Sequence, residues 1–179
     1  MRTLTASFAL LLTGLLLTNC GGDKKTDDGK TLVNNSFDEF QGWIDNSGGS
    51  LSNKAAHSGR YSLTIGGGRE YGLTFKSPLG QLIAAKPRKL AIEGWVRTEE
   101  PNSPAQLVVE VTRPGTDEKV FWKGVSLGEG SKPGQWTEIK KELALPDNVA
   151  SDQVLGVYLW GNSAAKPVYL DDLRITNAD

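Results

Sequence analysis

The amino-acid sequence predicts an all-β fold, a sandwich of two sheets built from roughly eight to ten strands. From Leu32 onward, short apolar alternations are separated by clusters of Gly, Asn, Ser and Pro, the pattern of strands joined by turns. No long segment has the 3.6-residue period of an amphipathic helix. The 179 residues include 21 Gly and 8 Pro, a content typical of a turn-rich fold. Residues 31–179 are therefore predicted to form one β-sandwich domain.

Three segments show a clear period of two and are the best-defined predicted strands: residues 89–99, 105–115 and 153–162. In each segment the aliphatic side chains share one phase, which is expected to face the core. The opposite phase carries aromatic and charged side chains, which are Glu93, Trp95, Arg97, Glu110, Tyr158 and Trp160.

Other segments are less regular. In residues 134–145 the aliphatic residues share one phase but Trp136 has the other, which predicts a β-bulge. Residues 119–128 leave open whether Phe121 or Trp122 faces the core. Residues 78–87 are confined by prolines at both ends and are predicted to be a connection with at most one helical turn.

The last predicted strand, residues 168–175, contains two adjacent carboxylates, Asp171 and Asp172. The apolar face changes phase across this pair, as a bulge there would allow. Two charges within a strand are unfavourable unless a hard cation or a set of backbone amides compensates them. The alternative is that both carboxylates face solvent at the rim of a sheet.

The N-terminus resembles a bacterial lipoprotein signal. A basic start precedes an apolar run at residues 8–17, and the only cysteine, Cys20, follows shortly after it. The resemblance implies a signal peptide at residues 1–19, lipidation of Cys20, a flexible tether at residues 20–30, and a lipid-anchored location in the bacterial cell envelope, at the outer membrane or cell surface. Asn19 departs from the small residue usual before such a cysteine, and an ordinary secretory leader is the alternative.

Composition disfavours two classes of function. With 20 basic and 21 acidic residues the formal net charge is −1, so no field attracts nucleic acid, and no nucleic-acid partner is predicted. His57 is the only histidine and Cys20 is assigned to the anchor, so Ser/His/Asp and Cys/His nucleophile systems lack members. A glycoside-hydrolysing carboxylate pair remains an alternative, with Glu93 and Glu110 as its candidates.

The ordered motifs of the body resemble carbohydrate-binding modules of the family 4, 9 and 22 type. They are NNSFDEFQGW, AAHSGRYSLTI, KLAIEGWVRT, GQWTEI and YLDDLRI, and together they cover nearly all of residues 32–176. The resemblance implies a jelly-roll fold and non-catalytic binding of a polysaccharide or oligosaccharide. The alternatives are a glycosidase or lyase on the same fold and a surface adhesion or protein-interaction domain.

The resemblance also implies a structural calcium ion where the first and last strands meet. Oxygen-only ligands without Cys or His are the set that such a hard cation prefers. The implied ligands are Asp38, Glu39, Ser58, Gly59, Asp171 and Asp172. The alternative is that these groups cap turns and rim strands.

The same resemblance places a sugar site on one sheet face. Trp95, Tyr158 and Trp160 are predicted to form one stacking platform, because their strands put the aliphatic residues on the other side. Glu93, Arg97 and Glu110 are the predicted partners of sugar hydroxyl groups. Packing roles are expected for Trp43 and Trp136, and the alternative for each platform ring is that it covers a second small core.

Overall fold

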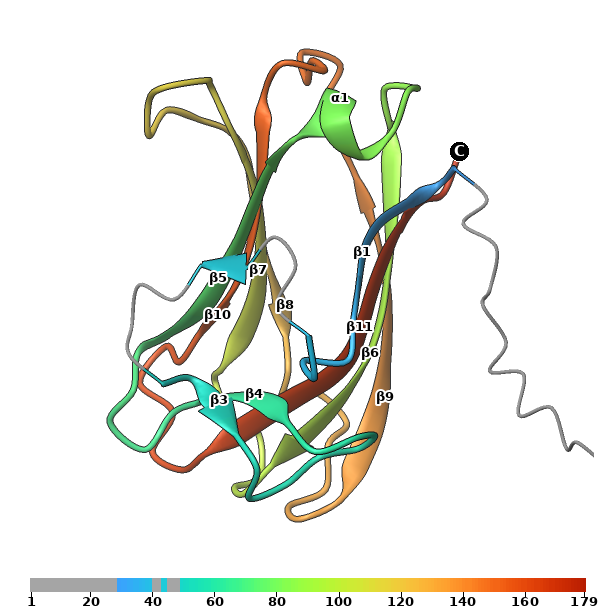
Figure 1. Ribbon diagram of the computed structural model, residues 1–179. Helices are drawn as coiled ribbons and strands as arrows, with labels where there is room; N and C mark the ends of the chain where they lie inside the picture. The colour runs from blue at the N-terminus through green and yellow to red at the C-terminus, as the bar shows by residue number, and fades with distance from the viewer. Residues whose placement is uncertain (1–28, 40–42, 45–48) are drawn as a thin grey trace, which may run out of the picture.

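The computed structural model describes residues 29–39, 43–44 and 49–179, and these form a sandwich of two facing antiparallel sheets (Figure 1). Eleven strands lie within these residues, two of them only two residues long. The predicted all-β two-sheet fold is therefore confirmed. Cys20, the predicted signal peptide and all but two residues of the predicted tether lie outside the described residues.

One sheet has six strands in the order β3-β4-β11-β6-β9, with β1 also pairing with β11. Their bounds are β1 Thr31–Asn35, β3 Leu51–Ser52, β4 Ser62–Ile65, β6 Lys89–Thr98, β9 Trp136–Ala144 and β11 Val168–Asn177. The other sheet has five strands in the order β2-β5-β10-β7-β8. Their bounds are β2 Trp43–Ile44, β5 Tyr71–Pro78, β7 Gln106–Thr112, β8 Lys119–Ser126 and β10 Val154–Trp160. The single turn α1, Leu79–Leu82, caps one end of the sandwich (Figure 1).

The core lies between the sheets and is built from the aliphatic phase of each strand. The predicted inward residues of β6, β7 and β10 are almost completely buried; they are Leu90, Ile92, Val96, Leu107, Val109, Val111, Leu155, Val157 and Leu159. Full burial of such a side chain stabilises the fold by about 1.5 to 3 kcal/mol. The opposite phase must therefore point away from the core on both outer faces of the sandwich.

Strand β11 changes its neighbour halfway along, at the two adjacent aspartates. Residues 168–170 pair with β4, whereas residues 173–176 pair with β1. The register against β6 shifts between Asp171 and Arg174, and Asp172 has a φ of +48°. The predicted bulge at the Asp pair is confirmed, and it lies opposite the gap between the ends of β1 and β4.

The sequence left the phase of β9 and β8 uncertain, and the structure decides both. The pairing of β6 with β9 runs from Lys89↔Ala144 to Arg97↔Trp136 without a shift, so the bulge predicted there is wrong. Trp136 is out of phase with the aliphatic residues because it lies on the outer face. In β8, Phe121 packs against the core while Trp122 is 41% exposed.

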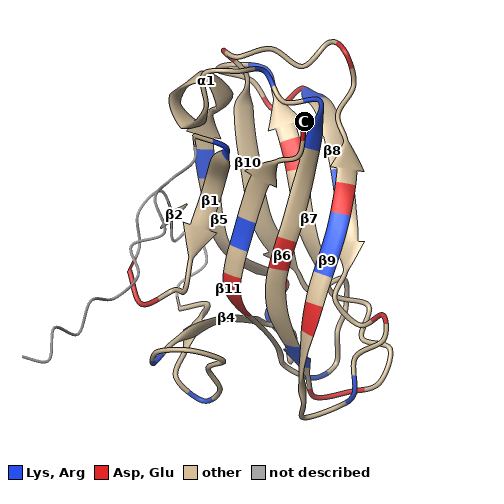
Figure 2. Ribbon diagram, turned by 90° about the vertical axis from the view of Figure 1, so that its right-hand side faces the viewer, with Lys and Arg blue, Asp and Glu red and all other residues tan. Residues whose placement is uncertain are grey.

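Figure 2 faces the six-stranded sheet, where β11, β6 and β9 lie side by side. Acidic and basic residues alternate along these strands, and Lys140 pairs with Glu138 at 3.0 Å. Among the residues that the structure describes, no helix has the length and apolar content needed to cross a membrane.

Candidate functional site

The predicted stacking platform is divided between the two outer faces of the sandwich. Trp95 lies on β6 in the six-stranded sheet, whereas Tyr158 and Trp160 lie on β10 in the five-stranded sheet. Glu93 and Arg97 accompany Trp95, and Glu110 accompanies Tyr158. The prediction of one platform from all three rings is therefore wrong, because strand parity indicates that a ring points outward but not which sheet carries the strand.

On the six-stranded sheet, the Trp95 ring is covered by a loop. His57, from the connection between β3 and β4, stacks on it with a centroid distance of 4.0 Å and an interplanar angle of 11°. Trp136 contacts the His57 ring edge-on, with a centroid distance of 5.6 Å. Arg97 is paired with Glu99 at 2.8 Å. These contacts form a small second core, the alternative expected for any single ring.

On the five-stranded sheet, four aromatic side chains gather on one outer face, hereafter the aromatic face. Tyr158 and Trp160 of β10 meet Tyr71 of β5 and Trp122 of β8. The centroid distances are 6.3 Å for Tyr71 to Tyr158 and 6.2 Å for Trp122 to Trp160. The Tyr71 side chain is 53% exposed and the Trp122 side chain 41%. Among the described residues these are the two large hydrophobic side chains that are exposed to solvent. A solvent-exposed apolar cluster of this kind is typical of a binding surface.

A chain of hydrogen bonds orients Tyr158 on this face. Trp122 Nε1 donates to the Tyr158 hydroxyl at 3.4 Å, and that hydroxyl donates to Glu110 Oε2 at 3.5 Å. Lys119 Nζ lies 3.3 Å from the same Glu110 oxygen. Burial raises the pKa of the Tyr158 phenol, while the hydrogen bond from Trp122 acts in the opposite direction. Tyr158 therefore keeps its proton and remains a hydrogen-bond donor at neutral pH.

Glycine on β10 lets Glu110 lie close to the sheet. Residue Gly156 pairs across the ladder with Lys76 on one side and Glu110 on the other. A Cβ added at Gly156 would lie 2.9 Å from Glu110 Cγ, closer than carbon atoms approach. The Glu110 side chain occupies the space that a side chain at this position of β10 would fill.

One end of the aromatic face is fixed by Glu70. Its Oε1 accepts a hydrogen bond from Trp160 Nε1 at 2.6 Å, and its Oε2 accepts one from the Ser163 amide at 3.4 Å. The indole of Trp160 is therefore held by a charge-assisted bond at its polar edge, which stabilises its orientation.

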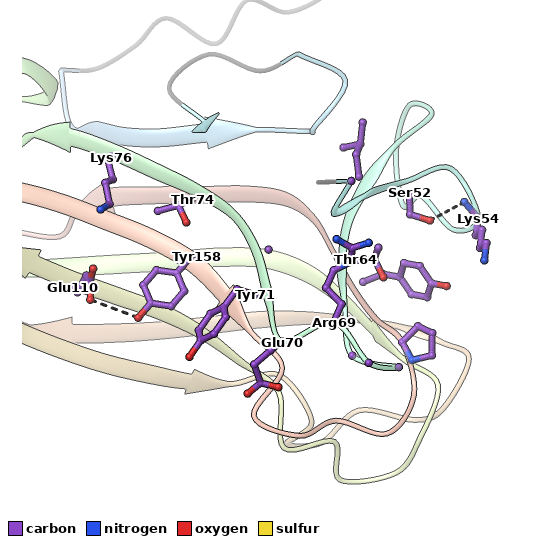
Figure 3. A pocket seen from close by; sticks show the side chains of 18 of the residues that line it. Ser52, Lys54, Thr64, Arg69, Glu70, Tyr71, Thr74, Lys76, Glu110 and Tyr158 are labelled. Carbon is purple, nitrogen blue, oxygen red and sulfur yellow. Dashed lines mark hydrogen bonds between the residues drawn. The ribbon is translucent and has the colours of Figure 1, made fainter. Parts of the chain in front are cut away.

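A cavity of about 1220 Å³ opens over part of this face and continues past residues 66–70 toward β3 and β4 (Figure 3). Tyr71 and Tyr158 lie beside each other in it, with Glu110 and Lys76 further along the strands. The polar and cationic residues along its wall include Lys54, Thr64, Arg69, Thr74, Lys76 and Lys119. Its volume is adequate for a ligand of several sugar rings.

Sequence reasoning placed Tyr158, Trp160 and Glu110 on outward faces but missed Tyr71 and left Trp122 undecided. Both missed rings lie in strands whose phase is hard to read from the sequence. The register of β5 against β10 shifts between Tyr158 and Trp160, which pairs Trp160 with Tyr71 instead of Gly72. In β8, Phe121 and Trp122 are adjacent aromatics, and only the pairing Glu110↔Trp122 decides between them.

The residues of the predicted calcium site do come together in the gap beside the β11 bulge. Asp171 Oδ2 accepts hydrogen bonds from the amides of His57 at 2.7 Å and Ser58 at 3.2 Å. Asp172 accepts from Ser58 Oγ and from His57 Nδ1, both at 2.6 Å. Asp38 accepts from the Arg60 amide at 2.9 Å. All of these donors belong to the connection between β3 and β4.

Gly59 is required by the close approach of Asp38. It has a φ of +55°, and a Cβ there would lie 1.6 Å from Asp38 Oδ2. Glu39 is exposed, away from any contact that the structure records. Within the described part of the chain, no three His, Cys, Asp or Glu side chains are close enough to share one metal ion.

Asp171 is fully buried, and the groups that donate to it are neutral. Burial raises the pKa of its carboxyl, three backbone amides lower it, and the neighbouring charge of Asp172 raises it again. A buried carboxylate without a cationic partner is the environment in which a bound cation is most favourable. The oxygen-only set of side chains is the kind that a hard cation prefers, while backbone amides already donate to Asp171.

The carboxylate pair considered for glycoside hydrolysis is excluded by the topology. Glu93 lies on the outer face of the six-stranded sheet and Glu110 on that of the five-stranded sheet. Two catalytic carboxyl groups must flank one glycosidic bond, so this pair cannot act together. The Ser58 hydroxyl donates to Asp172 and the His57 imidazole also contacts Asp172, so no Ser–His nucleophile pair is formed by these residues.

No family model matches this sequence, and no curated protein matches it. Solved structures do match. The CBM22-1 xylan-binding domain of Paenibacillus barcinonensis Xyn10C aligns with a TM-score of 0.54 at 22% identity, over 83% of this chain and 94% of that one. The C-terminal family 22 carbohydrate-binding module of Clostridium thermocellum Xyn10B aligns with a TM-score of 0.54 at 16% identity, over 85% and 97%.

A family 16 carbohydrate-binding module aligns equally well, with a TM-score of 0.54 at 17% identity, over 80% of this chain and 97% of that one. Each likeness spans almost the whole of the matched module. This chain therefore has the two-sheet fold of carbohydrate-binding modules.

Proposed function

We propose that this domain binds carbohydrate without chemically changing it, on the aromatic face of the five-stranded sheet. The observation that carries the proposal is the cluster of four rings on one outer face, where Tyr71 and Trp122 are exposed and Tyr71 and Tyr158 line a cavity. The other outer face offers no comparable surface among the described residues, because a loop covers Trp95.

Sugars suit this surface because a pyranose ring has apolar C–H faces edged by hydroxyl groups. The rings supply flat apolar contact, and each stacked ring contributes on the order of 1 kcal/mol. Glu110 and the Tyr158 hydroxyl lie beside the rings and are able to exchange hydrogen bonds with a ligand. A small number of polar groups within an aromatic surface provides orientation and specificity.

The test is titration of the full-length chain, kept in detergent, with a panel of polysaccharides that begins with xylan, since two structural neighbours are described as xylan-binding. Reducing ends are measured in parallel. Binding that is lost in the double variant Trp122→Ala, Tyr158→Ala, with no release of reducing ends, is the expected result. Reducing-end release would indicate an enzyme, and silence on every glycan would favour the adhesion alternative.

We also propose that a calcium ion stabilises the gap beside the β11 bulge. Asp171 and Asp38 would provide its carboxylate oxygens, together with backbone oxygens near Ser58 and Gly59. When bound, the ion would supply the positive charge that the buried Asp171 lacks. Calcium should then raise the melting temperature of the chelator-treated protein, since a ligand bound only to the folded state stabilises it. An unchanged melting temperature at millimolar calcium would contradict the proposal.

We further propose that Cys20 carries the lipid that anchors the protein to the cell envelope. The proposal rests on the apolar run at residues 8–17 and on Cys20 being the only cysteine. Cys20→Ser should move the protein from the membrane fraction to the soluble fraction. A Cys20→Ser protein that still partitions with membranes would contradict it.

A further inference from the structure

The aromatic face contains an ammonium group that pairs with no other residue that the structure describes. Lys76 of β5 shares a row of the ladder with Gly156, Glu110 and Trp122. It is exposed, and no ion pair or side-chain hydrogen bond joins it to the described part of the chain. Figure 3 shows its side chain over the same cavity as Tyr158 and Glu110. A charge in this position is available to a ligand that lies across the strands.

The two acidic groups nearest the rings already have protein donors. Glu110 is 8% exposed and is bonded by Lys119 and the Tyr158 hydroxyl. Glu70 is bonded by Trp160 and by the amide of Ser163. The third acid of the cavity, Asp117, is an exposed residue in the turn before β8.

Cationic groups outnumber acidic groups along this cavity, although the whole chain has a net charge of −1. Among the described residues, the cavity wall contains four cationic side chains, Lys54, Arg69, Lys76 and Lys119, and three acidic ones, Glu70, Glu110 and Asp117. The summed charge of these described residues therefore has the opposite sign to the net charge of the protein, which favours an anionic ligand.

We propose that the ligand of the aromatic face is an acidic polysaccharide, in which a uronate carboxylate pairs with Lys76 while a sugar ring lies against Tyr158. The inference rests on the proposed carbohydrate-binding function and specifies its ligand class. Lys76 lies beyond Gly156 in the same row, on the side of β10 opposite Glu110, and it lines the same cavity as Tyr158. Lys119 neutralises Glu110, which would otherwise repel that carboxylate.

The test compares polymers that differ only in charge. Glucuronoxylan, polygalacturonate and alginate are each paired with the same polymer whose carboxyl groups have been reduced to alcohols, and the dissociation constants of the full-length chain are measured by calorimetry. At least one acidic polymer should bind about fivefold more tightly than its reduced form at low salt. The preference should shrink in 0.5 M NaCl, because exposed charges are screened.

Lys76→Met keeps the apolar stem of the side chain and removes its charge, so it should abolish the preference while leaving affinity for the reduced polymer unchanged. Lys123→Met is the matched control: Lys123 is an exposed lysine of β8 in the phase opposite Trp122. It should behave as the parent.

Equal binding of the acidic and reduced polymers, or a preference that survives in Lys76→Met, would overturn the acidic-ligand inference while leaving carbohydrate binding intact. Failure to bind either member of all three pairs, and every neutral glycan, would overturn both.

Discussion

The two outer faces of this sandwich use similar residues for different purposes. Each presents aromatic and charged side chains in the phase opposite the core. On the six-stranded sheet, His57 covers Trp95 and Arg97 is paired with Glu99. On the five-stranded sheet, Tyr71 and Trp122 are exposed to solvent and Lys76 pairs with no other residue described by the structure.

The difference arises from one connection. The β3–β4 segment crosses the gap between β1 and β4, where Asp171 and Asp172 bind its amides and side chains. Once held there, its His57 lies on Trp95. No corresponding loop among the described residues stacks on the rings of the aromatic face. A ring that points outward is therefore a binding group only when no connection is anchored above it.

The largest expected effect is on stability, at the anchor of that connection. Asp171→Ala should lower the free energy of unfolding by about 2 to 4 kcal/mol, because three partly buried amides lose the buried carboxylate that accepts from them. The measurement is urea unfolding followed by tryptophan fluorescence. Glycan affinity of the folded fraction should not change, because Asp171 belongs to the other sheet.

Asp171→Asn is the matched control, since it keeps the shape and one acceptor oxygen and should lose less stability than Asp171→Ala. A loss below about 1 kcal/mol in Asp171→Ala would show that the carboxylate does not hold the connection.

The second prediction concerns the covered ring. Trp95→Ala should lower the free energy of unfolding by about 1.5 kcal/mol, because the stacking of His57 on the Trp95 ring is lost. Affinity for the glycan should equal that of the parent. If Trp95→Ala weakened glycan binding without changing stability, the assignment of binding to the five-stranded sheet alone would be wrong.

The third prediction concerns an open ring. Trp122→Ala should weaken glycan binding by about fivefold, which corresponds to about 1 kcal/mol. Its unfolding free energy should stay within about 0.5 kcal/mol of the parent, since the side chain is 41% exposed. Glycan affinity from calorimetric titration and unfolding free energy from urea are compared between Trp95→Ala and Trp122→Ala. An unchanged affinity in Trp122→Ala would show that this ring does not belong to the binding surface.

The fold was predictable from sequence because its signal is local. The period of two in β6, β7 and β10 is a property of consecutive residues, and the change of phase at Asp171 and Asp172 revealed the bulge. The candidate site was predicted only in part. The sequence assigned outward faces to Tyr158, Trp160 and Glu110. It did not show that these residues lie on a different sheet from Trp95, Glu93 and Arg97. That separation depends on which strands pair, and the alternation within a single strand does not encode the pairing.

Whether a loop covers an outward ring also depends on residues that are distant in the sequence. His57 is 38 residues before Trp95 in the sequence, and its placement depends on Asp172, a further 77 residues along. Conversely, the phase of Trp136 was interpreted as a bulge when it only reflected an outward ring. An out-of-phase aromatic in an edge strand is therefore equally consistent with a regular strand whose ring packs outside the core.

The smallest expected effect is a shift in the pKa of Tyr158, whose hydroxyl lies at the centre of the aromatic face. Burial raises the pKa of this phenol in the folded protein above its value in the unfolded chain. Because the folded-state pKa is raised, the stabilisation that Tyr158 contributes is complete below the unfolded-state pKa, near pH 10, and is lost as pH rises through the folded-state pKa. Glycan affinity should accordingly stay constant from pH 7 to about pH 10, where the hydroxyl still donates to Glu110.

The difference between the ultraviolet titrations of the parent and Tyr158→Phe isolates the titration of the Tyr158 phenol. Bound glycan should move the midpoint of that titration still higher by excluding water from the phenol. A midpoint at or below 10, or one that glycan leaves unchanged, would place Tyr158 outside the contact surface.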